Sequence, residues 1–354
     1  MRAVWDPEQV DGQWLQDVLT SAGATGDQQI TGVDATPIGT GQVGCNIRYR
    51  ITYDRSGPAP DSVVLKFASR SEDSRAIGIQ TLTYETEVAF YRDLAATVDV
   101  YRPHCWFAAV EPGTANVVLV LEDVQAQAGD QLAGCGTAEA ELAMDEAAKL
   151  HGPRWGDPRL LEVPWLAAKK ANAFDPGTVL ALVWPTFLER YRDALSEESV
   201  EVGSRLAAAR TWADPGASPL TVCHTDFRLD NMLFADPAGA RPLTVVDWQT
   251  VQLNAGPADV AYFLSAAMPP EQRRKVERDL LARYYGRLSA YDIGDYDFDH
   301  CWSDYRRHSF SGFFMAVFAS VAVGRTERGD EMFMTMANGA AAQVVDLGAI
   351  EFLA

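Results

Sequence analysis

Two carboxylates and a carboxamide between residues 220 and 249 have a spacing that could support metal and phosphate chemistry. An apolar run at 220–222 leads into a loop that holds Asp226 and Asn231, and a second apolar run ends on Asp247. The turn-forming residues at 236–239 predict a hairpin that returns the chain, so that Asp247 arrives beside the other two. Oxygen ligands of this kind suit Mg²⁺, which substrate phosphates usually complete.

The order of residues in this stretch resembles a known family. His224-x-Asp226-x-x-x-x-Asn231, followed by Asp247 at the end of a strand, resembles the catalytic loop and metal-binding Asp of the protein-kinase-like phosphotransferases. The Asp-Trp-Gln sequence at 247–249 is most similar to the aminoglycoside phosphotransferase and ecdysteroid-kinase-like branch. The resemblance implies that Asp226 accepts the proton of an acceptor hydroxyl. It also implies that Asn231 and Asp247 hold Mg²⁺ and that His224 braces the loop.

Two further residues gain a role from the same resemblance. Arg228 falls where protein kinases often have a phosphate-contacting lysine, so it could contact phosphate here. Asp259 lies in the first turn of a helix expected from Gly256 onward, where an acid is favourable to the helix dipole on its own. In kinase-like folds an Asp at this position hydrogen-bonds the backbone of the catalytic loop.

A glycine-rich turn precedes these motifs. Gly39, Gly41 and Gly44 lie between an extended segment at 30–38 and a strand at 45–53 in which apolar residues alternate. A dinucleotide-binding unit would need a helix directly after the glycines, so the strand excludes that reading. A glycine hairpin between two strands is instead what a kinase lays over nucleotide phosphates.

The next strand, at 62–67, is apolar apart from Lys66. A charge on a buried strand is costly unless it is paired, and the helix expected over 81–95 offers Glu85 and Glu87. Glu87 shares the helical spacing of the apolar stripe and is the predicted partner, with Glu85 as the alternative. In the resembled family this lysine contacts the α- and β-phosphates and the glutamate holds it.

Strands expected at 104–110 and 116–121 lead to a short segment that the resemblance identifies as the hinge between two lobes. There the backbone carbonyl of Glu122 and the N–H of Val124 would meet the adenine edge. The fold class is therefore expected to be α+β and bilobal, with an antiparallel sheet lobe at 1–123 and a mainly helical lobe at 124–354, and with ATP in the cleft. Asp6 and Pro7 predict the start of a first helix that ends at Gly23.

Composition narrows the possible partners. A formal net charge of −19 argues against nucleic acid as a partner, because that binding depends on clustered Lys and Arg. The five cysteines are odd in number and widely spaced, which favours reduced thiols in the cytoplasm. The apolar stretch at 310–323 is too short to span a membrane, no secretory signal is apparent, and no obligate protein partner is evident.

The predicted function is ATP- and Mg²⁺-dependent phosphoryl transfer to a hydroxyl of a small molecule, which could be aminoglycoside-, choline-, sugar- or sterol-like. One alternative is a catalytically inactive nucleotide-binding scaffold. A protein kinase is disfavoured because only eleven residues separate Asp247 from Asp259, which is too few for a peptide-holding segment. Thr225 also stands where regulated protein kinases have an arginine.

Overall fold

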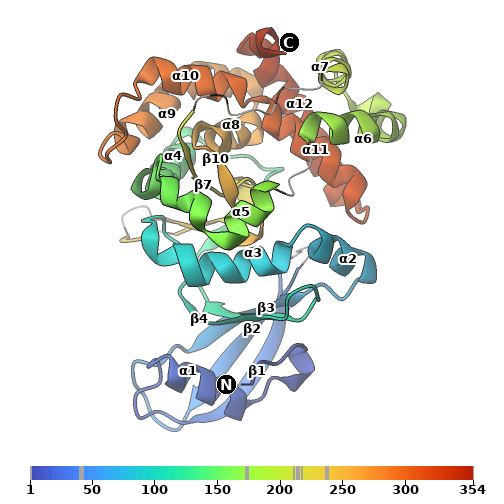
Figure 1. Ribbon diagram of the computed structural model, residues 1–354. Helices are drawn as coiled ribbons and strands as arrows, with labels where there is room; N and C mark the ends of the chain where they lie inside the picture. The colour runs from blue at the N-terminus through green and yellow to red at the C-terminus, as the bar shows by residue number, and fades with distance from the viewer. Residues whose placement is uncertain are drawn as a thin grey trace. The chain divides into compact units, whose positions relative to one another are not determined.

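Five antiparallel strands near the N-terminus form one sheet in the computed structural model of the chain (Figure 1). Their order across the sheet is β1-β2-β3-β5-β4. Their bounds are β1 Ile30–Ile38, β2 Gly44–Tyr53, β3 Ser62–Ala68, β4 Cys105–Val110 and β5 Val117–Glu122. Each of the five strands expected from the sequence is present to within one or two residues, and the predicted α+β fold class is confirmed.

The structure describes residues 2–39, 44–171, 175–209, 212, 216, 218–235 and 239–353. The chain divides into two compact units. The first contains Met1–Ala96 and Arg102–Gln125, and the second contains Thr97–Tyr101 and Ala126–Ala354.

Both faces of the first unit's sheet are covered by helices, and this explains its sequence pattern. On one face, alternate residues of β2 and β3 pack with helix α1 (Gly12–Ser21), to which Leu15 and Leu19 contribute. On the other face, alternate residues of β5 pack with helix α3 (Thr83–Ala89) through Tyr84 and Val88. Lys66 lies between Leu65 and Phe67, which both belong to the α1 core, so it belongs to the α3 face of the sheet.

The N-terminal helix begins later than predicted. Asp6 caps only a 3₁₀ turn (Pro7–Gln9), whereas Asp11 caps α1 by accepting the Trp14 N–H. The prediction of one helix from Asp6 is wrong because Val10 is extended and separates the two segments. Each segment has its own Asp cap, and the apolar spacing alone did not distinguish them.

The helix expected over 81–95 is also divided. Helix α2 (Glu72–Gln80), which the sequence analysis did not predict, ends before Leu82, whose φ of 55° breaks the helical path. Helix α3 then runs into a π-helical turn (Phe90–Leu94) and a 3₁₀ turn (Ala95–Thr97).

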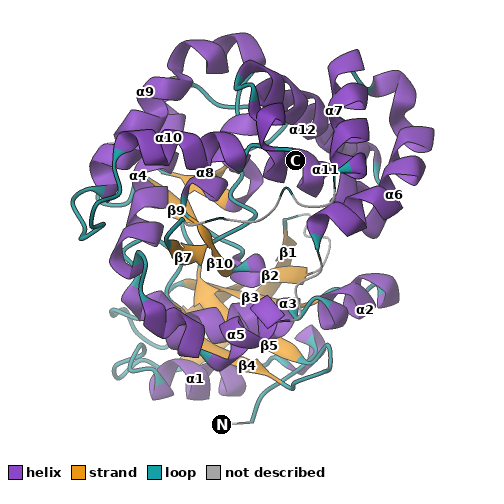
Figure 2. Cartoon of the chain, turned by 45° about the horizontal axis from the view of Figure 1, so that its top comes forward, coloured by secondary structure: helices purple, strands orange, loops and turns teal. Residues whose placement is uncertain are grey.

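Helices make up most of the second unit (Figure 2). Their bounds are α4 Thr137–His151, α5 Pro164–Ala171, α6 Pro176–Tyr191, α7 Glu197–Ala208, α8 Pro257–Ala266, α9 Pro270–Leu288, α10 Phe298–Arg307, α11 Phe310–Ala322 and α12 Glu327–Asp346. In the described part of the chain, no helix is both long and apolar enough to cross a membrane.

Short strands carry the motif residues of this unit. Strand β7 (Leu220–Cys223) pairs with β10 (Gln252–Ala255), while β8 (Met232–Phe234) pairs with β9 (Leu243–Val245) and with β6 (Gln127–Ala128). The two apolar runs predicted as strands are therefore β7 and β9. They do not pair with each other, because β7 pairs with β10 and β9 pairs with β8. Of the turn expected at 236–239, only Gly239 lies within the described residues.

Helix α8 is the centre of the second unit, and all of its residues are buried. Two glycines allow its neighbours to approach closely. A Cβ at Gly312 on α11 would lie 2.3 Å from the Ser265 Oγ, and one at Gly339 on α12 would lie 2.4 Å from the Ser265 carbonyl oxygen. This packing fixes α8, which in turn positions the loop after β7.

Candidate active site

The predicted oxygen ligands are neighbours in the second unit. Asn231 ends the loop that follows β7, and its side chain contacts Asp226 in the same loop. The N–H of Val246 donates to the Asn231 carbonyl oxygen at 3.0 Å, so Asp247, the next residue, follows directly from the strand beside Asn231. The β8–β9 pairing thus brings together an acid and an amide that are far apart in sequence.

The two carboxylate oxygens of Asp226 differ in their contacts. Oδ1 accepts hydrogen bonds from the Arg228 Nε at 2.9 Å and from the Tyr262 hydroxyl at 2.8 Å. Oδ2 accepts one, from the Asn231 Nδ2 at 2.8 Å. Since a carboxylate oxygen can accept two hydrogen bonds, Oδ2 is the atom that the described residues leave open to a further donor.

The donor set around Asn231 and Asp247 fits a hard cation. The Asn231 Nδ2 donates to both the carbonyl oxygen and the Oδ2 of Asp226, which leaves the Asn231 Oδ1 available as a ligand. Asp247 adds a carboxylate, whose Oδ2 accepts from the Gln249 Nε2 at 3.2 Å. An amide oxygen next to a carboxylate is the kind of site that Mg²⁺ occupies together with phosphate oxygens and water.

Thr225 and Asp247 have left-handed backbones, with φ values of 62° and 69°. This conformation is strained for residues with a side chain and especially for a β-branched one, and such strain gathers at functional sites. Reciprocal hydrogen bonds hold it here. The Thr225 hydroxyl donates to the Thr250 carbonyl at 2.8 Å, and the Thr250 hydroxyl donates to the His224 carbonyl at 2.7 Å.

Asp259 braces the loop from α8, as the resemblance implied. Its carboxylate is buried and accepts the N–H groups of His224 at 2.7 Å and of Thr225 at 2.8 Å. These hydrogen bonds satisfy two main-chain donors at the start of the loop, which would otherwise be buried without partners.

His224 is buried, and its partners define the role of each ring nitrogen. Its Nε2 lies 3.0 Å from the Val246 carbonyl, which can only accept, and its Nδ1 lies 3.3 Å from the N–H of Asp226, which can only donate. Nε2 is therefore the donor in the first contact and Nδ1 the acceptor in the second. In this way His224 ties the strand before Asp247 to the backbone of Asp226, consistent with the bracing role expected of it.

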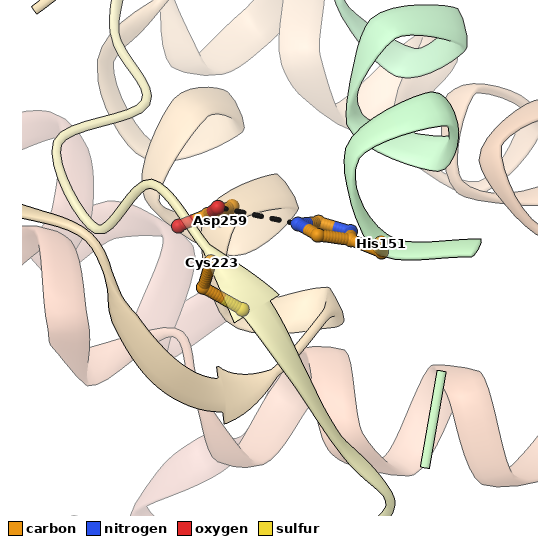
Figure 3. A group of neighbouring side chains, drawn as sticks. All are labelled: His151, Cys223 and Asp259. Atoms are coloured by element: carbon orange, nitrogen blue, oxygen red, sulfur yellow. Dashed lines mark hydrogen bonds and ion pairs between the residues drawn. The ribbon is translucent and has the colours of Figure 1, made fainter. Parts of the chain in front are cut away.

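Three buried side chains behind the loop could be taken for a metal site: His151, Cys223 and Asp259 (Figure 3). Their ligand-type atoms lie within 4.8 Å of one another. Asp259 already accepts two main-chain N–H groups and the His151 Nε2 at 3.2 Å, and the His151 Nδ1 contacts the Tyr284 hydroxyl at 2.9 Å. Burial, and next the charge of Asp259, raise the pKa of the Cys223 thiol well above its ordinary value, which disfavours the thiolate that a metal needs. The cluster is better described as a hydrogen-bonded support for α8.

Arg228 contacts the carboxylate of Asp226. Its Nη1 donates to the Asp230 Oδ2 at 2.6 Å and contacts the Met332 Sδ at 3.3 Å, in addition to the Nε contact with Asp226. Burial lowers the pKa of Arg228, but the charges of Asp226 and Asp230 more than offset this and raise the pKa above its ordinary value. A contact between Arg228 and phosphate stays a prediction.

In the first unit, Lys66 pairs with Glu87. The Lys66 Nζ lies 2.7 Å from the Glu87 Oε2, and the two side chains are only 11% and 4% exposed. Glu85 instead accepts the N–H of Gly113, in the turn between β4 and β5, at 2.9 Å. The predicted pairing of Lys66 with Glu87 is confirmed, and the alternative with Glu85 is wrong.

Two of the three predicted glycines can be placed. Gly39 has a φ of +72°, which favours glycine, and a Cβ added to Gly44 would lie 3.0 Å from the Lys66 Cε. A side chain at Gly44 would therefore press on the lysine. Gly41 lies outside the described residues.

Of the predicted hinge residues, Glu122 is the last residue of β5 and Val124 lies just beyond the strand. The N–H of Glu122 donates to the His104 carbonyl at 2.8 Å, and its Oε2 accepts the His104 N–H at 3.0 Å. Between Glu122 and Val124, the carboxylate of Asp123 accepts two hydrogen bonds from Arg48, at 2.8 and 2.9 Å. This ion pair fixes the segment on which both predicted adenine contacts depend.

A model of the phosphotransferase enzyme family matches residues 46–296, well over half of the chain. The chain belongs to this family. A search of curated proteins finds no match.

Solved structures share the fold of this phosphotransferase-family chain at low sequence identity. The wild-type aminoglycoside 2'-phosphotransferase-IIIa in complex with GDP has a TM-score of 0.53 and 13% identity, covering 94% of this chain and 99% of that one. The GDP and kanamycin complex of APH(2")-IIIa has a TM-score of 0.51 and 14% identity, covering 88% of this chain and 92% of that one. An ethanolamine kinase from Plasmodium vivax has a TM-score of 0.52 and 9% identity, covering 92% of this chain and 87% of that one.

Two contacts in this phosphotransferase-family chain were not predicted from the sequence. Tyr262 lies three residues after Asp259 on the same helix, so helical spacing places both on one face and could have identified it. Gln131 donates its N–H to the Asp230 Oδ1 at 2.9 Å, and its Oε1 accepts the Leu229 N–H at 3.1 Å. No local pattern in the sequence around Gln131 indicated its contacts with Leu229 and Asp230.

Proposed function

We propose that this chain transfers the γ-phosphoryl group of ATP to a hydroxyl group of a small molecule. The observation that carries this proposal is the arrangement of Asp226, whose Oδ2 is open while Asn231 fixes it beside Asp247. Family membership supports the reaction class. The net charge of −19 disfavours nucleic acid as a partner.

Asp226 is the proposed proton acceptor. Its Oδ2 hydrogen-bonds the acceptor hydroxyl and orients the oxygen toward the γ-phosphorus. As the new P–O bond forms and the bond to the leaving ADP breaks, the hydroxyl proton passes to Asp226. The braced loop contributes mainly by holding this geometry before the reaction.

Each unit contains residues that are proposed to contact the nucleotide. Asn231 and Asp247 would hold Mg²⁺, which when bound neutralises charge on the phosphates. Lys66, held by Glu87, would contact the α- and β-phosphates, and the main chain near Gly39, Gly41 and Gly44 would add N–H donors. The carbonyl of Glu122 and the N–H of Val124 would meet the adenine. Arg228 would orient Asp226 and could also reach phosphate.

The acceptor is proposed to be a small molecule because the segment after Asp247 is short. It consists of a 3₁₀ turn (Trp248–Thr250) and β10, and α8 begins at Pro257. That leaves no long segment on which to hold an extended peptide. The acidic charge favours a cationic acceptor slightly, through long-range attraction that salt would screen.

The kanamycin complex and the ethanolamine kinase among the structural neighbours suggest which acceptors to test first. Aminosugars and amino alcohols come first, followed by sugars and sterols. The five free thiols fit a reducing compartment, and the cytoplasm is the proposed site of action.

An ATP-consumption screen against such a panel tests the proposal, with Asp226→Asn and Asp247→Ala as paired variants. Asp226→Asn keeps the shape but loses the proton acceptor, so turnover should fall by at least about 100-fold with little change in nucleotide affinity. Asp247→Ala should weaken Mg·ATP binding as well, which calorimetry with and without Mg²⁺ would measure. Tight Mg·ATP binding without turnover on any acceptor would favour the inactive scaffold. Unchanged turnover in Asp226→Asn would contradict the assigned role.

A further inference from the structure

Helix α8 reaches the catalytic loop through a second residue, Tyr262. Its hydroxyl lies 2.8 Å from the Asp226 Oδ1, and the side chain is buried. Asp259, three residues earlier on the same helix, holds the main-chain N–H groups of His224 and Thr225. One helix face therefore holds the loop at its backbone and at its carboxylate.

The direction of the Tyr262 hydrogen bond is fixed. Burial, followed by the charge of Asp226, raises the pKa of Tyr262 well above its ordinary value, so the phenol is protonated near neutral pH. A carboxylate can only accept, so the phenol donates. Hydrogen bonds to a charged group are about twice as strong as neutral ones, which makes this contact an effective restraint on a side chain.

Arg228, the other donor to Oδ1, is itself anchored elsewhere. Its Nη1 is held by Asp230, and Asp230 in turn accepts from the Gln131 N–H and from Arg328 on α12, at 2.9 Å and 3.2 Å. Arg228 approaches Oδ1 from its own loop, whereas Tyr262 approaches from α8. The two donors together saturate Oδ1, and without Tyr262 the Arg228 Nε would be the one donor that the described residues still offer to this oxygen.

We propose that Tyr262 is a positioning residue that fixes the rotation of the Asp226 carboxylate, so that Oδ2 and not Oδ1 meets the acceptor hydroxyl. The role of Tyr262 in catalysis rests on the proposed function, whereas its effect on the orientation of the Asp226 carboxylate does not. Tyr262 touches no reacting atom and acts only through Asp226.

The test compares Tyr262→Phe with Tyr305→Phe. Tyr305 is also buried in the second unit, and its hydroxyl donates to the Glu277 Oε1 at 2.6 Å, so this control removes a buried hydroxyl away from the loop. Crystal structures of the wild type and of both variants would show the orientation of the Asp226 carboxylate. Steady-state kinetics on the acceptor found by screening, or on slow ATP hydrolysis, would give kcat and KM.

In Tyr262→Phe the carboxylate should be rotated or spread over two orientations, and kcat should fall by about ten- to a hundredfold with KM for Mg·ATP unchanged. Tyr305→Phe should leave the carboxylate and kcat as in the wild type. An unmoved carboxylate in Tyr262→Phe, or a moved one with unchanged kcat, would overturn the inference. A wild-type protein without turnover would refute the proposed function alone, and the carboxylate orientation would then decide the role of Tyr262.

Discussion

The Asp259 carboxylate offers the sharpest test of how the catalytic loop is held. Replacing it by Asn keeps the shape but exchanges one oxygen for an NH₂ group. The loop presents two N–H donors to this side chain, at 2.7 Å from His224 and 2.8 Å from Thr225. An amide can accept only one of them, so the other N–H would face a donor.

The magnitude follows from these contacts. A buried donor left without an acceptor costs about 1–3 kcal/mol, and the remaining hydrogen bond loses its charge assistance, worth roughly another 1 kcal/mol. Thr225 also holds a strained backbone, with a φ of 62°, that the lost contact helped to maintain. The local stability of the loop should therefore fall by about 2–4 kcal/mol.

Hydrogen–deuterium exchange of a peptide covering residues 220–227 would measure this loss. A fall of this size corresponds to roughly 30- to 1000-fold faster exchange if the amides exchange through local opening. Asp304→Asn is the matched control. Asp304 is also buried in the second unit, but it accepts the hydroxyls of Ser218 and Tyr296, at 2.6 and 2.7 Å, which can rotate to another partner. Equal exchange of the peptide in the wild type and Asp259→Asn would refute the bracing role, as would an equal increase in the Asp304→Asn control.

Two further predictions concern ion pairs. Lys66→Met removes the cation that pairs with the buried Glu87 carboxylate, and breaking a buried ion pair typically costs about 3–5 kcal/mol. Lys66→Met/Glu87→Leu should recover most of the thermal stability without recovering Mg·ATP affinity. A double variant as unstable as the single one would contradict this. Asp145 on α4 is paired with Arg283 and Arg287 on α9; burial raises its pKa, but hydrogen bonds to the two arginines outweigh this and lower the pKa below the ordinary value. This stabilisation is fully present at pH values above the ordinary pKa of Asp and is lost as the pH falls through the lowered pKa of Asp145. Tm should therefore drop more between pH ~5 and ~3 in the wild type than in Asp145→Asn. Equal drops in Tm would refute the ion-pair assignment.

The features that the sequence predicted well are those set by local pattern. The alternation in β2 and the single charge in β3 predicted the strands, and the helical spacing of Glu87 correctly identified the partner of Lys66. The loop motif predicted that Asp226 and Asn231 lie close together, and their side chains are hydrogen-bonded.

What the sequence did not predict depends on long-range packing or on single backbone angles. Leu82 adopts a positive φ, so α3 begins at Thr83, two residues later than the helix predicted from Thr81. Gln131 meets Leu229 across nearly a hundred residues of sequence, and nothing near Gln131 indicates that contact. Tyr262 lies between these two cases. Its position on the same helix face as Asp259 was predictable from helical spacing, but its contact with Asp226 was not.

The most direct test of the central claim is the fate of the γ-phosphate. Purified protein would be incubated with γ-labelled ATP, Mg²⁺ and either a pool of small metabolites and aminoglycosides or a mixture of native and denatured proteins, with Asp226→Asn in parallel. If the acceptor is a small molecule, we expect label in the small-molecule fraction, at least about 100-fold less label with Asp226→Asn, and none transferred to protein. Label found only in protein bands, with none in the small-molecule fraction, would contradict this expectation.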